Sequence, residues 1–221
     1  MSTVVAEFVP AGVREERYQS EAGLERALIE QLQAQAYDYL PITSEADLIA
    51  NLRRQLEVLN RIEFSDAEWQ RFFPRRSQAP TTVSSRKPPV SKGDLNPALK
   101  RDDGSSKNIY LIDKRNIHNN RLQVINQYEV EGARADRYDV TVLVNGLPMV
   151  HVELKRRGVD IREAFNQIDR YQRDSFGRLR PVEHVQLFVI SNGTLTKYYS
   201  NTAQRPLGRA TREAFSQQDL E

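Results

Sequence analysis

The sequence predicts an α/β fold in which helices flank a mixed β-sheet. Apolar residues recur with a helical period between residues 20 and 73, whereas from residue 108 onward they alternate with the period of two that marks half-buried strands. A second helical pattern, from residue 160 to about 175, interrupts the strand region. Helices followed by a sheet with a helix packed across it are typical of an α/β sandwich.

Each of the three helices expected before residue 74 begins near a serine. A serine at the N-cap accepts a hydrogen bond from a backbone amide two or three residues further on. In the third helix Ser65 is followed three residues later by Glu68, which predicts a capping box. The expected helices run from Ser20 to about Tyr39, from about Glu45 to Arg61 after Thr43 and Ser44, and over a short stretch with Trp69, Phe72 and Phe73.

The remaining patterns divide the chain into three parts. Residues 1–18 look irregular or strand-like, and residues 75–96 lose all periodicity among serines, threonines and prolines. We expect an N-terminal helical part over 1–74, an irregular basic segment rich in proline and serine over 75–107, and an α/β core over 108–221. The expected strands cover residues 108–112, 122–130, 137–144, 149–155, 185–190 and 195–199, and Asp160 would cap the helix that follows the fourth strand.

The composition limits the class of protein. With 221 residues, 39% of them hydrophobic and 28% charged, the chain suits one or two globular domains. The net charge of +2 is too small to indicate a nucleic-acid partner by itself. The absence of cysteine excludes disulfides, thiolate metal sites and a cysteine nucleophile. No membrane-length apolar run, signal peptide or Walker-type loop occurs in the sequence. A cytoplasmic protein without a membrane partner is therefore expected.

The third and fourth expected strands flank a tight turn at Asn145-Gly146. A two-residue turn is the usual choice for such a hairpin. It would, however, pair Val144 with Leu147 and place Asp139 and Glu153 on opposite faces of the sheet, because a shift of one residue reverses every side chain. Matching both the apolar and the polar faces requires one more residue. We therefore expect a three-residue loop, Asn145-Gly146-Leu147, and Asp139 directly opposite Glu153.

Facing carboxylates on neighbouring strands indicate a site for a cation, because the two groups otherwise repel each other. Asp139 and Glu153, with the carbonyl oxygen of Leu154 as a third ligand, suit the oxygen ligands that Mg²⁺ prefers. Lys155, on the same face as Glu153, could stabilise charge on a phosphate or orient an attacking water. His151 shares this face, and a flanking position is expected for it. The alternative is a surface salt bridge of Lys155 with a carboxylate, which contributes little to stability.

The expected helix from residue 160 carries a second group of candidates. Gln167 and Tyr171 are spaced i, i+4 and share one flank, where they could bind backbone phosphate or a metal-bound water. The alternative is that Tyr171 extends the buried stripe while Gln167 is solvated. Arginines around the same site could contact phosphates or form a solvated basic face. These arginines are Arg156, Arg157, Arg162, Arg170 and Arg173.

Four segments of the strand region stand out together. They are Arg-Tyr-Asp-Val-Thr-Val-Leu-Val-Asn-Gly-Leu-Pro from Arg137, Val-Glu-Leu-Lys-Arg-Arg-Gly from Val152, Ile-Arg-Glu-Ala-Phe-Asn-Gln-Ile-Asp-Arg-Tyr from Ile161, and Leu-Phe-Val-Ile-Ser-Asn-Gly from Leu187. These segments resemble the N-terminal nuclease domain of the restriction (motor) subunit of type I restriction-modification enzymes. The likeness extends back from the strands through residues 108–130 and more loosely over 20–73.

The resemblance implies a PD-(D/E)xK fold and Mg²⁺-dependent cleavage of double-stranded DNA. It also implies assembly with modification and specificity subunits, and ATP would act only through domains absent from this chain. A nuclease active by itself and an inactive docking fragment are the alternatives. The residues that match the family's catalytic positions are Asp139, Glu153 and Lys155 in the triplet, Gln167 and Tyr171 in a Gln-x-x-x-Tyr motif, and, on the first helix, Glu25 or, as second choice, Glu21.

Two departures from this family are visible. Its subunits normally continue into helicase-like ATPase domains and a helical C-terminal domain, whereas this sequence ends at Glu221, so a fragment or truncated product is expected. Over residues 75–96 the family usually shows a strand with a Glu-Lys-Thr pattern. Here Ser-Ser-Arg-Lys-Pro-Pro begins at Ser84. A compensated frameshift and an ordinary basic linker are the two interpretations of this segment.

Overall fold

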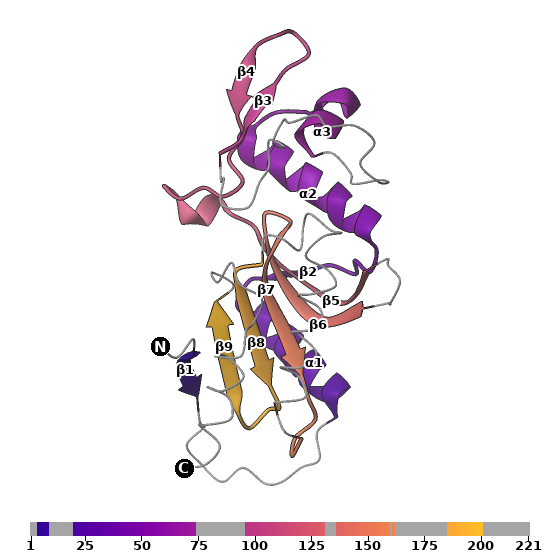
Figure 1. Ribbon diagram of the computed structural model, residues 1–221, viewed down its shortest axis with the longest axis vertical. Helices are drawn as coiled ribbons and strands as arrows, with labels where there is room; N and C mark the ends of the chain where they lie inside the picture. Colours follow the sequence, from indigo (N-terminus) through magenta and orange to yellow (C-terminus); the bar gives the residue numbers. More distant parts are fainter. Residues whose placement is uncertain are drawn as a thin grey trace, which may run out of the picture.

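A seven-stranded mixed sheet forms the centre of the chain (Figure 1). The computed structural model describes residues 4–8, 20–73, 96–130, 136–159, 161 and 185–200. The strands of this sheet are β1 (Val4–Phe8), β2 (Asp38–Tyr39), β5 (Leu122–Val130), β6 (Asp136–Val144), β7 (Leu147–Leu154), β8 (Leu187–Ser191) and β9 (Thr196–Ser200). Their order is β1-β9-β8-β7-β6-β5-β2. Only the pairs β2–β5 and β7–β8 are parallel among these strands.

The predicted α/β class with a mixed sheet is confirmed. Helix α1 (Glu21–Ala34) lies across one face of the sheet (Figure 1). Its apolar stripe covers the alternating valines and leucines of the central strands, which explains why one face of each strand is apolar. In this contact Leu24, Leu28, Ile29 and Leu32 of the helix pack with Val124, Val140, Val152 and Leu154 of the sheet.

The three caps predicted before residue 74 all form, whereas the one predicted at Asp160 lies outside the described residues. The Ser20 hydroxyl accepts a hydrogen bond from the Gly23 amide at 3.1 Å. The Ser44 hydroxyl does the same for the Asp47 amide at 3.2 Å at the start of α2 (Glu45–Asn60). Helix α3 (Asp66–Phe72) has the full capping box, in which Ser65 and Glu68 each accept the other's backbone N–H at 3.1 Å. These bonds satisfy amides that a helix leaves without intrahelical partners.

The predicted end of the first helix at Tyr39 is wrong. Helix α1 ends at Ala34, and Ala36 adopts a left-handed φ of 65° that turns the chain back toward the sheet. The next residues form β2, which pairs in parallel with β5, as Asp38 with Gln123 and Tyr39 with Val124. The sequence shows no C-cap signal that would end the helix before Tyr39. Pairing of residues 38 and 39 with β5, at a sheet edge that would otherwise be open, ends it earlier.

The strand predicted over residues 108–112 is also wrong. The paired residues lie earlier, in β4 (Ser106–Asn108), which forms a separate two-stranded sheet with β3 (Ala98–Lys100). Ile109 and Leu111 are 0% and 1% exposed, yet they are buried by helices and not by strand pairing. A short apolar run therefore indicated burial correctly and the type of element incorrectly, which is the usual ambiguity of such runs. A 3₁₀ turn, η1 (Ile117–Asn119), precedes β5.

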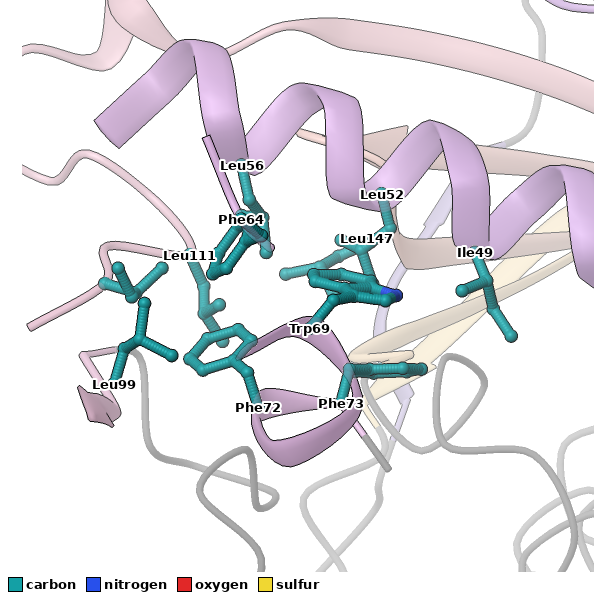
Figure 2. Close-up of a cluster of buried hydrophobic side chains, with 11 residues drawn as sticks. Ile49, Leu52, Leu56, Phe64, Trp69, Phe72, Phe73, Leu99, Leu111 and Leu147 are labelled. Carbon is teal, nitrogen blue, oxygen red and sulfur yellow. The ribbon is translucent and has the colours of Figure 1, made fainter. Parts of the chain in front are cut away.

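A second cluster of buried side chains joins α2, α3 and the β3–β4 hairpin to the turn between β6 and β7 (Figure 2). Trp69 is its central aromatic residue, with ring centroids 5.2 Å from Phe64 and 5.5 Å from Phe73. Figure 1 shows these elements beyond the turn end of the hairpin, away from α1. The cluster consists of Ile49, Leu52, Leu56, Phe64, Trp69, Phe72, Phe73, Leu99, Ile109, Leu111 and Leu147.

Several predictions fall outside the described residues. Residues 75–95 are among these, and so are residues 162–184, which contain most of the helix expected from 160 to 175; Ile161 is helical and 4% exposed. The strand-like alternative for residues 1–18 agrees with β1. The division at residues 74 and 107 stays a prediction, although β3 lies inside the segment that we expected to be irregular. Within the described residues, no helix is long and apolar enough to span a membrane.

Candidate active site

The β6–β7 hairpin turns in two residues, so the predicted three-residue loop is wrong. Val144 pairs with Leu147, and both turn residues have positive φ, 51° at Asn145 and 79° at Gly146. Asparagine followed by glycine is the preferred pair for such a turn. Glycine is also required by space, because a Cβ at Gly146 would lie 2.6 Å from the Leu52 Cα of α2.

The additional residue that the register needs lies inside β7. Leu143 pairs with Pro148 but Val142 pairs with Val150, which leaves Met149 as a one-residue β-bulge. Pro148 has no N–H for the ladder, and the break follows it directly. Beyond the bulge Val140 pairs with Val152. Continuing this register would place Asp139 opposite Glu153, and the two carboxyl groups are close enough for the charge of Asp139 to act on Glu153. The predicted juxtaposition of the two acidic residues is therefore present, although its cause differs from the one expected.

Asp139, Glu153 and Lys155 meet where β7 ends. The Asp139 Oδ2 accepts a hydrogen bond from the Leu154 amide at 2.7 Å. Lys155 Nζ lies 3.0 Å from Glu153 Oε1, with side chains 13% and 0% exposed. The ion pair proposed as the alternative is therefore present, but it is buried. Glu153 Oε2 is buried and has no hydrogen-bond partner among the described residues.

The environment shifts the pKa values of both carboxyl groups in the direction that favours protonation. Burial raises the pKa of Glu153 to about 8; the neighbouring Asp139 adds to this shift and Lys155 opposes it. Burial also raises the pKa of Asp139, against the Leu154 N–H bond and the charge of Lys155. Near neutral pH the metal-free site therefore holds a proton on Glu153 more readily than a solvated carboxyl group would.

His151 lies on the same face as Glu153 and is 2% exposed. Its Nδ1 lies 3.0 Å from the Thr141 hydroxyl, and its ring contacts Phe188 edge to face at 6.2 Å between centroids. Burial lowers the pKa of His151 to about 3, so the ring is neutral. These contacts agree with the flanking position expected from the sequence.

Both acidic candidates of α1 lie at this end of the sheet. The Glu25 carboxylate accepts hydrogen bonds from the side-chain amides of Asn126 and Gln127 on β5, and its charge raises the pKa of Asp139. Glu21 Oε1 accepts from the Arg156 amide at 3.2 Å, and its charge raises the pKa of both Asp139 and Glu153. The order of preference between the two stays a prediction. Nothing in the sequence pointed to Asn126 or Gln127 as partners.

The remaining candidates are placed only in part. Gln167 and Tyr171 lie outside the described residues, as do Arg162, Arg170 and Arg173. Arg156 is exposed. Arg157 is half-buried and donates to the Gly193 carbonyl at 3.4 Å, in the turn that follows β8.

The ligands that the site offers suit a small divalent cation that prefers oxygen better than a metal that prefers histidine. The site offers two carboxylates next to the backbone of Leu154, and one of them has a buried oxygen without a hydrogen-bond partner in the part of the chain that the structure describes. No group of three or more histidine, aspartate and glutamate side chains positioned to hold a metal occurs among the described residues. Mg²⁺ is commonly held by one or two carboxylates and keeps several waters, so two carboxylates are a sufficient donor set.

Comparison with known proteins shows the family of the chain. The profile of the family described as "Type I restriction enzyme R protein N terminus" matches residues 18–207. The chain is 50% identical over 192 residues to the type I restriction enzyme EcoprrI endonuclease subunit of Escherichia coli, covering 86% of this chain and 61% of that subunit. It is 41% identical over 189 residues to the SsaAORF53P endonuclease subunit of Staphylococcus saprophyticus, covering 83% of this chain and 20% of that protein.

A third relative extends the same pattern. The SauMSSORF170P endonuclease subunit of Staphylococcus aureus strain MSSA476 is 39% identical over 189 residues, which cover 83% of this chain and 20% of that subunit. The chain thus spans a fifth of the staphylococcal subunits and about three fifths of the one from Escherichia coli. The match over residues 18–207 includes every site residue described above. The chain belongs to the type I restriction enzyme R protein N-terminal family.

Proposed function

We propose that this chain is the DNA-cleaving part of a type I restriction subunit and hydrolyses phosphodiester bonds of double-stranded DNA with Mg²⁺. One observation carries the proposal: Glu153 is fully buried beside Asp139, with one oxygen lacking a partner among the described residues. Burying a carboxylate pair is costly unless positive charge joins it. A bound divalent cation would supply that charge, and Lys155 alone leaves Glu153 with a pKa of about 8.

The arrangement supports assignment to the PD-(D/E)xK fold. That pattern places one acid on a strand and a Glu-x-Lys triplet on the adjacent antiparallel strand. Here Asp139 lies on β6, and β7 ends with Glu153 and Leu154 immediately before Lys155. An acidic helix start, with Glu21 and Glu25, packs at the same end of the sheet. A shared geometry of this kind bears on function more directly than the α/β class, which hosts many activities.

Each residue has a role that its position supports. Asp139 and Glu153 would hold the cation together, with the Leu154 carbonyl as an additional ligand. Mg²⁺, when bound, supplies neutralisation of phosphate charge and a more acidic water. The Leu154 amide orients the Asp139 carboxylate through its hydrogen bond. The Lys155 ammonium, held at Glu153, stabilises negative charge on the transferring phosphate or orients the attacking water. Gln167 and Tyr171 keep their proposed role as phosphate or water contacts.

The wider context of this activity is also part of the proposal. The relatives are named endonuclease subunits of type I restriction enzymes, and the chain covers only part of each. We propose that modification and specificity subunits assemble with the protein to which it belongs. ATP would be used by domains that this sequence does not include. The partner would select the DNA sequence, because the described elements present no recognition helix for base reading.

Alanine variants of the triplet test the cleavage proposal in the assembled restriction complex. Asp139→Ala should abolish DNA cleavage while ATP hydrolysis continues, because only the nuclease site has lost a ligand. Lys155→Ala should slow cleavage on the order of 10²–10³-fold, with Mg²⁺ binding still measurable by calorimetry, because a lysine is not a metal ligand. Asp103→Ala, the same change in an exposed turn, is the matched control and should cut normally.

The outcomes separate the proposal from its alternatives. Full cleavage by Asp139→Ala would refute the site assignment. Loss of cleavage and ATP hydrolysis together would indicate misfolding. A complex that assembles but never nicks DNA would identify the chain as a docking fragment. Cleavage by the isolated chain without ATP would identify a nuclease that acts by itself.

A further inference from the structure

The segment that carries Lys155 is held by a turn far away in the sequence. Lys155 is the first residue after β7, and its amide donates to the Ser191 carbonyl at 2.8 Å. That bond is the last one between the ends of β7 and β8. The chain then runs through Arg156, Arg157 and Gly158 to Val159 outside the sheet ladder. The position of the Lys155 backbone thus depends on what holds these following residues.

Asn192 lies in the turn between β8 and β9, and its side chain bonds to Val159, the last described residue of the loop that follows Lys155. Its Nδ2 donates to the Val159 carbonyl at 2.9 Å. Its Oδ1 accepts from the amides of Thr194 at 3.1 Å and Leu195 at 2.8 Å. One side-chain amide therefore shapes its own turn with the oxygen and fixes the loop after Lys155 with the nitrogen.

Neighbouring contacts place this turn firmly against the rest of the site. The Gly193 carbonyl accepts from Arg157 at 3.4 Å, and the Gly193 amide donates to the Ser191 hydroxyl at 3.2 Å. Gly193 has a φ of +76°, and a Cβ there would lie 2.7 Å from Leu24 Cδ2 of α1. On the other side of the loop the Arg156 amide donates to Glu21. The loop is thus fixed between the β8–β9 turn and the first turns of α1.

We propose that Asn192 is a positioning residue that holds Lys155 at Glu153 through its bond to Val159. The inference rests on the proposed nuclease function, because it assigns the residue a part in the same site. Without the Asn192 donor, the bond that Val159 keeps among the described residues is the one from its amide to the Arg156 carbonyl, which lies within the loop itself. The Lys155 backbone would then have more freedom, and its ammonium would meet Glu153 less often. Even a small misalignment of the Lys155 ammonium should slow cleavage, because a preorganised charge stabilises the transition state only when it is correctly placed.

Two substitutions separate this role from simple support of the turn. Asn192→Asp keeps an oxygen that can accept from Thr194 and Leu195 but removes the donor to Val159. Asn192→Ala removes both. Thr194→Asp places the same added charge on an exposed neighbour and leaves the amide of Asn192 intact, so it is the matched control. All variants are assayed in the assembled restriction complex with Mg²⁺. Hydrogen exchange of the peptides covering residues 155–159 is measured on the same samples.

Both Asn192 variants should lower kcat about 10–100-fold, the usual cost of losing a group that orients a catalytic residue. The KM for DNA and the affinity for Mg²⁺ should stay the same, because DNA and metal contacts are retained. Exchange at 155–159 should accelerate while the strands β5 and β6 keep their protection. Thr194→Asp should match the wild type in every measurement.

Three results would overturn the inference. The first is normal cleavage by both Asn192 variants. The second is slower cleavage with unchanged exchange at residues 155–159, which would place the cause elsewhere. The third is slower cleavage with a general loss of melting temperature and protection, which would reduce Asn192 to a structural role. Failure of the wild-type complex to cleave refutes the proposed function instead, and the exchange data then still show whether Asn192 holds the loop.

Discussion

The two ends of the β6–β7 hairpin both bury polar side chains but differ in how these are satisfied. At the turn end Asn145, 1% exposed, uses its side chain fully: Oδ1 accepts from the Arg121 amide at 2.8 Å, and Nδ2 donates to the Leu111 carbonyl at 3.0 Å and to Asn120 at 2.8 Å. Asn51 of α2 and Gln123 of β5 are likewise bonded to each other, at 3.0 Å. At the other end Glu153 is 0% exposed, and one of its oxygens has no partner among the described residues.

This difference separates the buried polar groups that stabilise the fold from those that are candidates for a catalytic role. A buried polar group that is fully hydrogen-bonded is compatible with stability, whereas one left unsatisfied has a cost that needs another explanation. The turn end joins the sheet to the α2–α3 cluster by neutral amides. The site end brings together carboxylates whose pKa values are raised, which is typical of functional sites. Each of the three predictions below tests one end of the hairpin.

The largest expected effect is on the pH dependence of stability at the site end. The folded state binds a proton at Glu153 up to about pH 8, and the ordinary value is 4.5. Between these values the folded state holds more protons than the unfolded state, so the free energy of unfolding should fall as pH rises and level off above pH 8. The total is on the order of 5 kcal/mol at most.

Glu153→Gln should remove most of that pH dependence, because glutamine has no proton to lose. Urea unfolding in EDTA at about pH 5 and about pH 9 measures it. Glu63→Gln, the same change at an exposed position, is the control and should behave like the wild type. Equal pH dependence in Glu153→Gln and wild type would mean that Glu153 titrates as an ordinary solvated carboxyl group.

The turn end should lose stability when its network is cut. Asn145→Ala removes three hydrogen bonds, of which the one to the Leu111 carbonyl is buried, and takes the acceptor from the Arg121 amide. It also places alanine at a φ of 51°, where asparagine is better tolerated. The free energy of unfolding should fall by about 3 kcal/mol. Chemical denaturation checks this value, with the exposed Asn116→Ala as control. Cleavage per folded molecule should be unchanged, and a selective loss of cleavage would contradict the proposed division between the two ends.

The smallest expected effect concerns metal binding. A cation at Asp139 and Glu153 must displace the proton of Glu153, so the apparent affinity for Mg²⁺ should rise with pH and level off near pH 8. Below pH 8 the apparent affinity for Mg²⁺ should increase almost tenfold, or by about 1.4 kcal/mol, for each unit by which the pH rises. Calorimetry in buffers of different ionisation enthalpy would also detect the released proton. An affinity independent of pH between about 6 and 8 would remove Glu153 from the set of ligands.

The comparison also explains where sequence reasoning succeeded and failed. Capping serines, the α/β class and the pairing of Asp139 with Glu153 were predicted because each depends on local chemistry or on alternation along a strand. The location of the additional residue was wrong, since a two-residue Asn145-Gly146 turn and a bulge at Met149 give the same register as a three-residue loop. Alternation fixes which residues share a face and leaves open where the ladder is interrupted.

By itself the sequence determined the residues of the candidate site and the face of the sheet on which they lie, because these follow from the period of a strand and the chemistry of Asp139, Glu153 and Lys155. Only the tertiary structure decided the burial of Glu153, the approach of Glu21 and Glu25, and the bond from Asn192 to the loop after Lys155. Each of these depends on packing between segments far apart in the chain. A local sequence pattern does not show which distant segments pack together. The burial of Glu153 and its oxygen, unsatisfied among the described residues, arise only from that packing.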